Sequence, residues 1–238
     1  RMPLDTLDTT LDSVHALTPN VKQFLIRAEG HTFDFVPGQH VNVEFEDADG
    51  NARYRPYSPV SQPGTETLSL AIKRYPQGAC STWMHDRTVG DSIPVTPPSG
   101  NLQLQDPDRD AVFVATGTGL TPLFAMATQH LHVGEGRTTL LFGERTQESV
   151  MYRETLDLLS ASHAAFSVEY VLSGEDWHGR TGYVQDRLPE VVDDVSTSHF
   201  YVCGVPEMVV ETKARLSDLE VPDEQVFTEG WEDGAVAE

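Results

Sequence analysis

The first hundred residues alternate between apolar and polar side chains in short runs, for example at 22–27, 40–45 and 67–72. Turn-forming pairs such as Asp49-Gly50 and Pro63-Gly64 separate these runs. Alternation with a period of two is the pattern of half-buried strands, and closely spaced strands joined by turns are typical of a closed antiparallel barrel. We therefore predict a Greek-key β-barrel domain over 1–104. One short helix is expected at 82–86, with Ser81 as its N-cap.

The pattern changes after the polar, turn-rich segment 105–110, which we interpret as a linker. Strand-like and helix-like runs then alternate. Strands are predicted at 111–115, 138–142, 166–172, 199–203 and 225–228, and helices at 122–132, 151–160, 182–188 and 206–219. This alternation predicts a second domain over 111–238, an α/β Rossmann-like fold with a parallel sheet covered by helices on both faces.

Composition limits the classes of partner. The longest apolar runs, such as 111–115, are far too short to span a membrane, and no charged-then-apolar leader opens the chain, so we expect a cytoplasmic protein without a membrane partner. Cys80 and Cys203 are too few for an iron–sulfur cluster or a structural zinc site, and no His-Glu-x-x-His motif occurs, so no metal is expected. A disulfide between them is not expected, because each lies in a motif of its own.

The chain is strongly acidic, with 37 acidic against 16 basic residues and a net charge of −21. Nucleic-acid binding is disfavoured, because phosphate backbones require a basic surface. Only three of the basic residues are lysines. An acidic, lysine-poor surface is typical of a protein adapted to a salt-rich cytoplasm, where self-repulsion is screened. The alternative is an ordinary acidic protein.

Three motifs carry the candidate chemistry. The run Gly117-Thr118-Gly119-Leu120-Thr121-Pro122 follows a predicted strand and opens a helix, where small residues let the backbone approach a pyrophosphate. It lacks the third glycine of the dinucleotide fingerprint, so a tight structural turn remains the alternative.

The other two motifs lie in the barrel half. In Arg55-Pro56-Tyr57-Ser58, the guanidinium is suited to a phosphate, the phenol ring to a flat heterocycle and the hydroxyl to a ring nitrogen. The run Gly78-Ala79-Cys80-Ser81 at a helix start offers N–H groups to an anion. The alternatives are a surface arginine over a core tyrosine, and an ordinary capped helix.

In their order and spacing these motifs resemble the ferredoxin–NAD(P)+ reductase family, from about residue 7 to Trp231. The resemblance implies an FAD-binding barrel and an NAD(P)-binding α/β domain. It also implies a role for each matching position in the barrel. Arg55, Pro56, Tyr57 and Ser58 would bind the FAD phosphates and flavin ring, with Ser58 facing flavin N5; Ala71, Ile72 and Lys73 would follow the ribityl chain; and Gly78, Ala79, Cys80 and Ser81 would bind the pyrophosphate.

The resemblance extends to the second domain. Gly117, Thr118, Gly119 and Thr121 would bind the nicotinamide nucleotide; Cys203, Gly204 and Met208 would lie beside the nicotinamide; Ser173, Arg180 and Tyr183 would meet the adenosine half; and Glu229 and Trp231 would neighbour the reacting rings. Ser58, Cys203, Glu229 and Trp231 form the implied catalytic set. Phe227 competes with Trp231 as the ring that stacks on the flavin. Since Gly174 stands where NADP-preferring relatives have arginine, NADH is favoured over NADPH.

The implied activity is hydride transfer between nicotinamide C4 and flavin N5, followed by single-electron transfer to a separate carrier such as ferredoxin or an oxygenase component. The alternatives are an NAD(P)H:flavin reductase that releases reduced flavin and a non-catalytic electron-transfer or regulatory subunit. A monomer is expected. Ferredoxins are usually acidic, so docking to this acidic chain requires high salt, a local basic cluster such as Arg27, Arg53, Arg74 and Arg87, or another acceptor.

Overall fold

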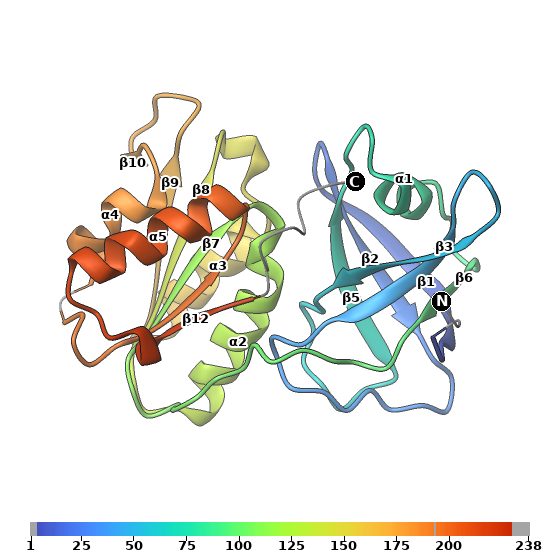
Figure 1. Ribbon diagram of the computed structural model, residues 1–238, viewed down its shortest axis with the longest axis horizontal. Coiled ribbons are helices and arrows are strands. Elements are labelled where there is room, and N and C mark those ends of the chain that lie inside the picture. Colours follow the sequence, from blue (N-terminus) through green and yellow to red (C-terminus); the bar gives the residue numbers. More distant parts are fainter. Residues whose placement is uncertain (1–3, 193, 230–238) are drawn as a thin grey trace. The chain divides into compact units, whose positions relative to one another are not determined.

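A computed structural model describes residues 4–192 and 194–229. The chain divides into two compact units, the first ending at Gln103 and the second beginning at Leu104 (Figure 1). Each unit has a six-stranded sheet of its own.

The first unit is an antiparallel sheet in which sequence neighbours are not always neighbours in space. Its strands are β1 (Leu7–Thr18), β2 (Val21–Arg27), β3 (Val41–Glu46), β4 (Ala52–Tyr57), β5 (Thr67–Lys73) and β6 (Ser92–Val95). They are ordered β4-β3-β6-β1-β2-β5, so that β6 is inserted between β3 and β1. After β4 the chain meets β5, where the Val60 N–H donates to the Ser69 carbonyl at 2.8 Å. The predicted antiparallel barrel is confirmed.

The barrel core takes its side chains from alternate strand positions, for example Phe24 and Ile26 on β2, as the period-two pattern predicts. Helix α1 (Ala79–His85) adds Cys80 and Met84 to the same core. Gly78 is the N-cap of α1, so the prediction that Ser81 caps a helix beginning at 82 is wrong. The Ser81 hydroxyl instead accepts the Tyr75 N–H at 3.2 Å and donates to the Gly78 carbonyl at 3.1 Å.

The second unit is a parallel sheet with helices between its strands (Figure 1). The strands are β7 (Ala111–Thr116), β8 (Thr138–Glu144), β9 (Phe166–Leu172), β10 (Arg180–Thr181), β11 (His199–Cys203) and β12 (Val226–Thr228). The α-helices are α2 (Leu120–Val133), α3 (Arg153–Ser162), α4 (Val184–Val191) and α5 (Pro206–Asp218), and the 3-10 turns are η1 (Gly117–Gly119), η2 (Gln147–Ser149) and η3 (Asp223–Gln225). The predicted Rossmann-like fold is confirmed.

Helix starts differ from the prediction where the backbone is constrained. Helix α3 begins at Arg153 rather than 151, because Tyr152 before it has a left-handed backbone with φ of 58°. Helix α4 begins at Val184 rather than 182, since Tyr183 is still extended. Helix α2 begins at Leu120, two residues earlier than predicted, so Pro122 lies within its first turn, where a missing N–H costs no helical hydrogen bond.

The strand order of this unit is β10-β9-β8-β7-β11-β12. The chain runs outward from β7 to β9 and β10, then returns to place β11 on the other side of β7. The order therefore reverses between β7 and β11, and in open parallel sheets ligands bind beyond the carboxyl ends of the strands at such a switch point. Those ends are Thr116 and Cys203, each followed by a motif predicted from the sequence.

The described helices include none that is both long enough and apolar enough to cross a bilayer.

Candidate functional site

The flavin motif lies at the end of β4, an outer strand of the sheet order that pairs with β3. Arg55 is exposed, and its guanidinium donates to its neighbour's carbonyl, Tyr54 O, at 3.0 Å. Tyr57 packs half-buried against the barrel core, and Ser58 is buried. The strand therefore presents an exposed cation beside a ring that packs against the core.

The structure brings the flavin motif and the turn at 78–81 together through Tyr57 and Cys80, whose side chains lie close enough to influence each other's pKa. Burial raises the pKa of the Cys80 thiol to about 11 and raises that of the Tyr57 phenol even further above its ordinary value. Both groups are therefore neutral at pH 7. The charge of Arg55 acts on both in the opposite direction, which places the guanidinium beside the same cluster.

The turn at 78–81 is held by its own side chain. The Ser81 hydroxyl is engaged with backbone groups, and a Cβ on Gly78 would overlap that hydroxyl. Ala79 is exposed and Cys80 is buried. Gly78 therefore lies directly against the Ser81 hydroxyl, and the surface of the turn is formed by backbone rather than by bulky side chains.

The predicted residues of β5 divide into two groups. Ala71 and Ile72 are buried, so neither side chain reaches the surface. The Ile72 carbonyl accepts the ring N–H of His85 at 2.8 Å. Lys73 lies at the surface with its ammonium 5.8 Å from the centre of the Tyr75 ring. Tyr75, 51% exposed, was missed by the sequence reasoning. Its signal was an aromatic residue directly before the Pro76-Gln77-Gly78 turn.

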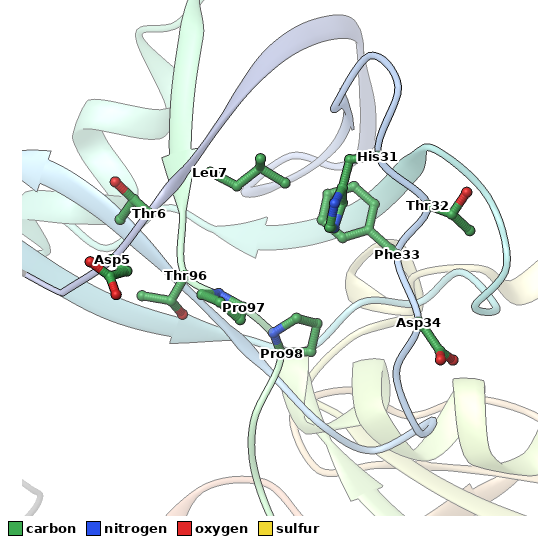
Figure 2. A pocket seen from close by; sticks show the side chains of 10 residues that line it. All are labelled: Asp5, Thr6, Leu7, His31, Thr32, Phe33, Asp34, Thr96, Pro97 and Pro98. Atoms are coloured by element: carbon green, nitrogen blue, oxygen red, sulfur yellow. The ribbon is translucent and has the colours of Figure 1, made fainter.

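A separate hollow of about 350 Å³ opens on the barrel unit between the start of β1, the loop after β2 and the segment after β6 (Figure 2). Leu7, Phe33, Pro97 and Pro98 contribute its apolar walls. The rings of His31 and Phe33 meet edge to face, 5.1 Å apart. None of the predicted flavin residues lines this hollow, so the flavin is not assigned to it.

In the second unit, the loop after β7 is a 3-10 turn that leads directly into α2. Gly117 has φ of 55°, which favours glycine, and nothing lies within 4 Å of the position of its absent Cβ. No side chain caps the start of α2, and the Thr121 hydroxyl donates to the Thr118 carbonyl at 3.0 Å. The loop thus presents open backbone at the N-terminus of a long helix, which suits a pyrophosphate.

This loop crosses the segment after β11 with backbone against backbone. A Cβ on Gly119 would overlap the Cys203 carbonyl, and one on Gly204 would overlap the Thr116 hydroxyl and the Met208 methyl group. The Val205 N–H donates to that hydroxyl at 3.3 Å. Thr116 was not predicted from the sequence, since a threonine at the end of a buried strand carries no distinct signal.

Cys203 and Glu229 are brought together at the carboxyl end of β11. Burial raises the pKa of the Cys203 thiol to about 12, and the nearby Glu229 carboxylate raises it as well. The thiol is therefore neutral at pH 7 and unsuited to act as a covalent nucleophile. Met208 lies in the first turn of α5, where its sulfur accepts the Thr212 hydroxyl at 3.2 Å.

Of the two candidates for the ring that stacks on the flavin, the structure describes only Phe227. Trp231 lies outside the described residues. Phe227, on β12, is stacked on Tyr201 with ring centres 5.2 Å apart and meets His199 edge to face. Phe227 is thus already part of an aromatic cluster on the sheet.

The predicted adenosine residues lie beyond β9. The Ser173 N–H donates to the Glu144 carbonyl at 3.0 Å, which ties the ends of β8 and β9 together. Tyr183 is 62% exposed at the N-cap of α4. Arg180 forms ion pairs with Glu169 and Glu190, so its charge is already balanced within the protein.

The two half-sites fit nucleotide cofactors. The barrel half offers an exposed guanidinium beside a fixed phenol ring, and the α/β half offers open glycine backbone at the start of an uncapped helix. Cys80 and Cys203 are both free thiols. Among the described residues, no group of three histidine, cysteine or acidic side chains could hold a metal ion.

Comparison with known proteins agrees with this division. Residues 8–104 match the family described as "Oxidoreductase FAD-binding domain", and residues 113–214 match "Oxidoreductase NAD-binding domain". The fold and the two half-sites thus define an FAD- and NAD(P)-binding oxidoreductase.

The relatives are more specific. The chain is 34% identical to ferredoxin–NADP reductase B of Sorangium cellulosum, over 96% of this chain and 98% of that protein. It is 31% identical to NADH-cytochrome b5 reductase 1 of Dictyostelium discoideum, over 80% and 69% respectively. The crystal structure of a Neisseria gonorrhoeae ferredoxin NADP+ reductase with bound FAD and NADP has the same fold, with a TM-score of 0.83 at 21% identity, covering 95% of this chain and 99% of that one. The chain belongs to the ferredoxin–NADP reductase family.

Proposed function

We propose that the protein is a reductase that takes electrons from NAD(P)H through FAD and delivers them one at a time to a separate carrier, a ferredoxin or an oxygenase component. The observation that carries this proposal is the contact between Tyr57 and Cys80, which unites two motifs of the barrel beside the charge of Arg55. FAD supplies the redox chemistry, because it exchanges two electrons with a nicotinamide and one with a carrier.

The protein's own residues position the cofactors and exclude water. Arg55 would bind a phosphate of FAD, Tyr57 would pack on the flavin ring, and Ser58 would face its reactive nitrogen. The fixed position of Tyr57 supports this assignment, since a ring held by the core orients a flat ligand without moving itself. The backbone at 78–81 would lie along the pyrophosphate.

In the α/β unit, Gly117, Thr118 and Gly119 would hold the nucleotide pyrophosphate. Cys203 and Glu229 would lie beside the nicotinamide. The neutral thiol supports a packing role for Cys203, and the adjacent carboxylate supports a polar contact from Glu229 to the ring substituent.

The basic cluster suggested for docking the electron acceptor is neutralised by acidic neighbours. Each arginine of the suggested docking cluster is paired with an acid: Arg27 with Asp12, Arg53 with Asp47, Arg74 with Asp86 and Arg87 with Asp91. These pairs leave little free positive charge for an acidic carrier. The cluster therefore gives less support for ferredoxin docking than the sequence suggested, and we expect carrier reduction to depend strongly on salt.

The proposal is tested through Arg55. The purified protein should bind FAD, turn yellow and oxidise NADH or NADPH with a dye acceptor, followed at 340 nm. Arg55→Ala should weaken FAD binding about 10-fold to 100-fold, because a hydrogen bond to a charged group contributes roughly 1.5–3 kcal/mol and each 1.4 kcal/mol is tenfold. Flavin titration followed by fluorescence quenching measures this change.

Arg53→Ala is the matched control. Arg53 is two residues away on the same strand, is exposed and is paired with Asp47 at 2.7 Å. FAD affinity should be unchanged in this variant. A protein that binds no flavin and leaves absorbance at 340 nm unchanged would refute the proposed function, and equal losses in the two variants would refute the role of Arg55.

A further inference from the structure

We propose that the protein selects NADH over NADPH, and that it does so by holding Arg180 in ion pairs with Glu169 and Glu190 while acidic side chains occupy the end of the sheet where a 2′-phosphate would lie. This inference rests on the proposed function and deepens it. The names of the two relatives above contain NADP and NADH respectively, so membership of the family leaves the choice of nucleotide open.

The ion pairs of the Arg180 side chain are the first step. Arg180 lies on β10 beside Val171 of β9, and the partner that meets its Nε, Glu169, lies two residues earlier on β9 at 3.1 Å. The other partner, Glu190, lies in the last turn of α4, which returns the chain towards the start of β11. Both carboxylates thus neutralise the guanidinium from within the protein. These pairs compete with any phosphate at the carboxyl ends of the strands, where nucleotides bind.

Glu190 is itself held in place. Arg187 Nη1 contacts its other oxygen at 2.7 Å, and Arg187 also donates to the Thr181 carbonyl at 2.8 Å. Hydrogen bonding to Arg187 is the main cause that lowers the pKa of Glu190, and the charge of Arg180 adds to it. Glu190 therefore stays ionised at neutral pH, and Arg180 would have to break two ion pairs to reach a phosphate.

The carboxyl ends of β8 and β9 carry the second step. Glu144 ends β8, and Glu175 and Asp176 follow Ser173 beyond β9. Glu175 accepts the Gln147 N–H at 2.7 Å, so this carboxylate is fixed between the two loops. A carboxylate accepts hydrogen bonds from a ribose 2′-hydroxyl, whereas it repels a 2′-phosphate with a charge of roughly −1.5 to −2.

Three other cations lie near this edge among the described residues. Arg187 donates to the Thr181 carbonyl at the carboxyl end of β10, and its guanidinium is also paired with Glu190. Arg153 lies over the rings of Tyr170 and Trp177, 5.5 and 5.6 Å from their centres, and faces Asp157 at 3.8 Å. Its charge is thus engaged by two aromatic faces and a carboxylate. Arg145 is exposed just after β8, and its carbonyl accepts the Gly174 N–H at 2.8 Å. Arg145 is the residue through which the proposal could fail.

The first test compares nucleotides on the FAD-loaded protein. Calorimetric titration should show NAD+ binding at least about tenfold more tightly than NADP+, a difference of about 1.4 kcal/mol. Steady-state oxidation of NADH and NADPH should give a ratio of kcat/KM in the same direction. NADP+ binding as tightly as NAD+ overturns the preference alone. If neither nucleotide binds, the proposed function fails as well, so the two failures are distinguishable.

The second test releases the arginine. The double variant Glu169→Gln/Glu190→Gln should bind NADP+ about fivefold more tightly, in line with the ~1 kcal/mol that an exposed charge pair is worth, while NAD+ affinity stays within twofold. Adding Arg180→Ala should remove that gain. The matched control is Asp106→Asn, which removes a surface pair with Arg109 at 3.5 Å in the same unit and should change neither affinity. No gain in the double variant overturns the role of Arg180.

Two single variants test the contributions of Glu175 and Arg145 to nucleotide choice separately. Glu175→Gln keeps an oxygen for the Gln147 N–H but removes the charge. The difference in binding affinity between NAD+ and NADP+ should therefore become smaller. Arg145→Ala should leave NADP+ affinity unchanged; a marked loss there would identify Arg145 as a 2′-phosphate ligand and overturn the proposal. Thermal unfolding of every variant confirms that it is folded before binding is compared.

Discussion

Gly119 and Gly204 are the residues at which the loop after β7 and the loop after β11 touch. Neither has a positive φ; each is small because another part of the chain passes where its side chain would be. For Gly119 the obstacle is backbone, the carbonyl of Cys203, which cannot rotate away as a flexible side chain can. Substitution there must therefore separate the β7 loop from the β11 loop.

Gly119→Ala should destabilise the protein by about 1–3 kcal/mol, the usual cost of overpacking, and should also weaken NAD+ binding. Gly136→Ala is the matched control. Its Cβ would overlap the Arg109 carbonyl, but Gly136 precedes β8 and so lies at the amino ends of the strands, opposite the loop at 117–119. Chemical denaturation should show similar losses of stability in both variants, with NAD+ affinity reduced in Gly119→Ala alone. Unchanged NAD+ affinity in both would contradict the binding role of the loop.

Residue types could be predicted from the sequence, but their partners could not. The run Arg55–Ser58 was recognisable by its chemistry, and so was the glycine loop at 117–119. The pairing of Arg180 with Glu169 and Glu190 depends on the register of β10 against β9 and on the course of α4, which no local pattern specifies. The proximity of Cys203 and Glu229 likewise depends on the parallel register of β12 beside β11, in which Val202 pairs with Thr228.

At the scale of elements, α1 is held to the barrel by polar contacts at its last turn. The Nε2–H of His85 donates to the Ile72 carbonyl at 2.8 Å, and Lys22 Nζ donates to the His85 carbonyl at 3.1 Å. Burial is the main cause that lowers the pKa of His85 below its ordinary value of 6.5. Protonation is therefore more favourable in the unfolded chain than in the folded one.

Stability should consequently fall as the pH decreases through 6.5, because the unfolded state then binds a proton that the folded state resists. His85→Gln keeps an N–H donor for Ile72 but cannot titrate, so its unfolding midpoint should fall less between pH 7 and pH 5 than that of the unmodified protein. His15→Gln, at an exposed position on β1, is the control and should follow the unmodified protein. Identical curves for all three proteins would show that His85 does not contribute.

The succession of strands and helices was predictable because the apolar period changes from two to a helical pattern after residue 110. The first and last residues of these elements were less predictable. Serine is a preferred N-cap, but the Ser81 hydroxyl already serves Tyr75 and Gly78, and the helix begins before it. Strand β10 has two residues, Arg180 and Thr181, too few to produce any alternation.

At the scale of the whole molecule, the charge of −21 sets the response to salt. At 1 M ionic strength the Debye length is about 3 Å, so repulsion between surface carboxylates is largely screened. The unfolding midpoint should rise steadily as KCl increases from 0.05 M to 3 M if the chain is adapted to high salt. Glycerol at equal osmolality should not reproduce the rise below 1 M. A midpoint independent of KCl would support an ordinary acidic protein.

The position of β11 has a consequence for biosynthesis. This fully buried strand lies directly beside β7, pairing His199 with Ala111, although all of β8, β9 and β10 come between them in sequence. During synthesis one flank of β7 therefore stays exposed until nearly the last helix is made. Contacts between segments so distant in sequence also form slowly. The barrel is complete much earlier. Nascent chains stalled before residue 199 should thus depend on chaperones to protect that open flank.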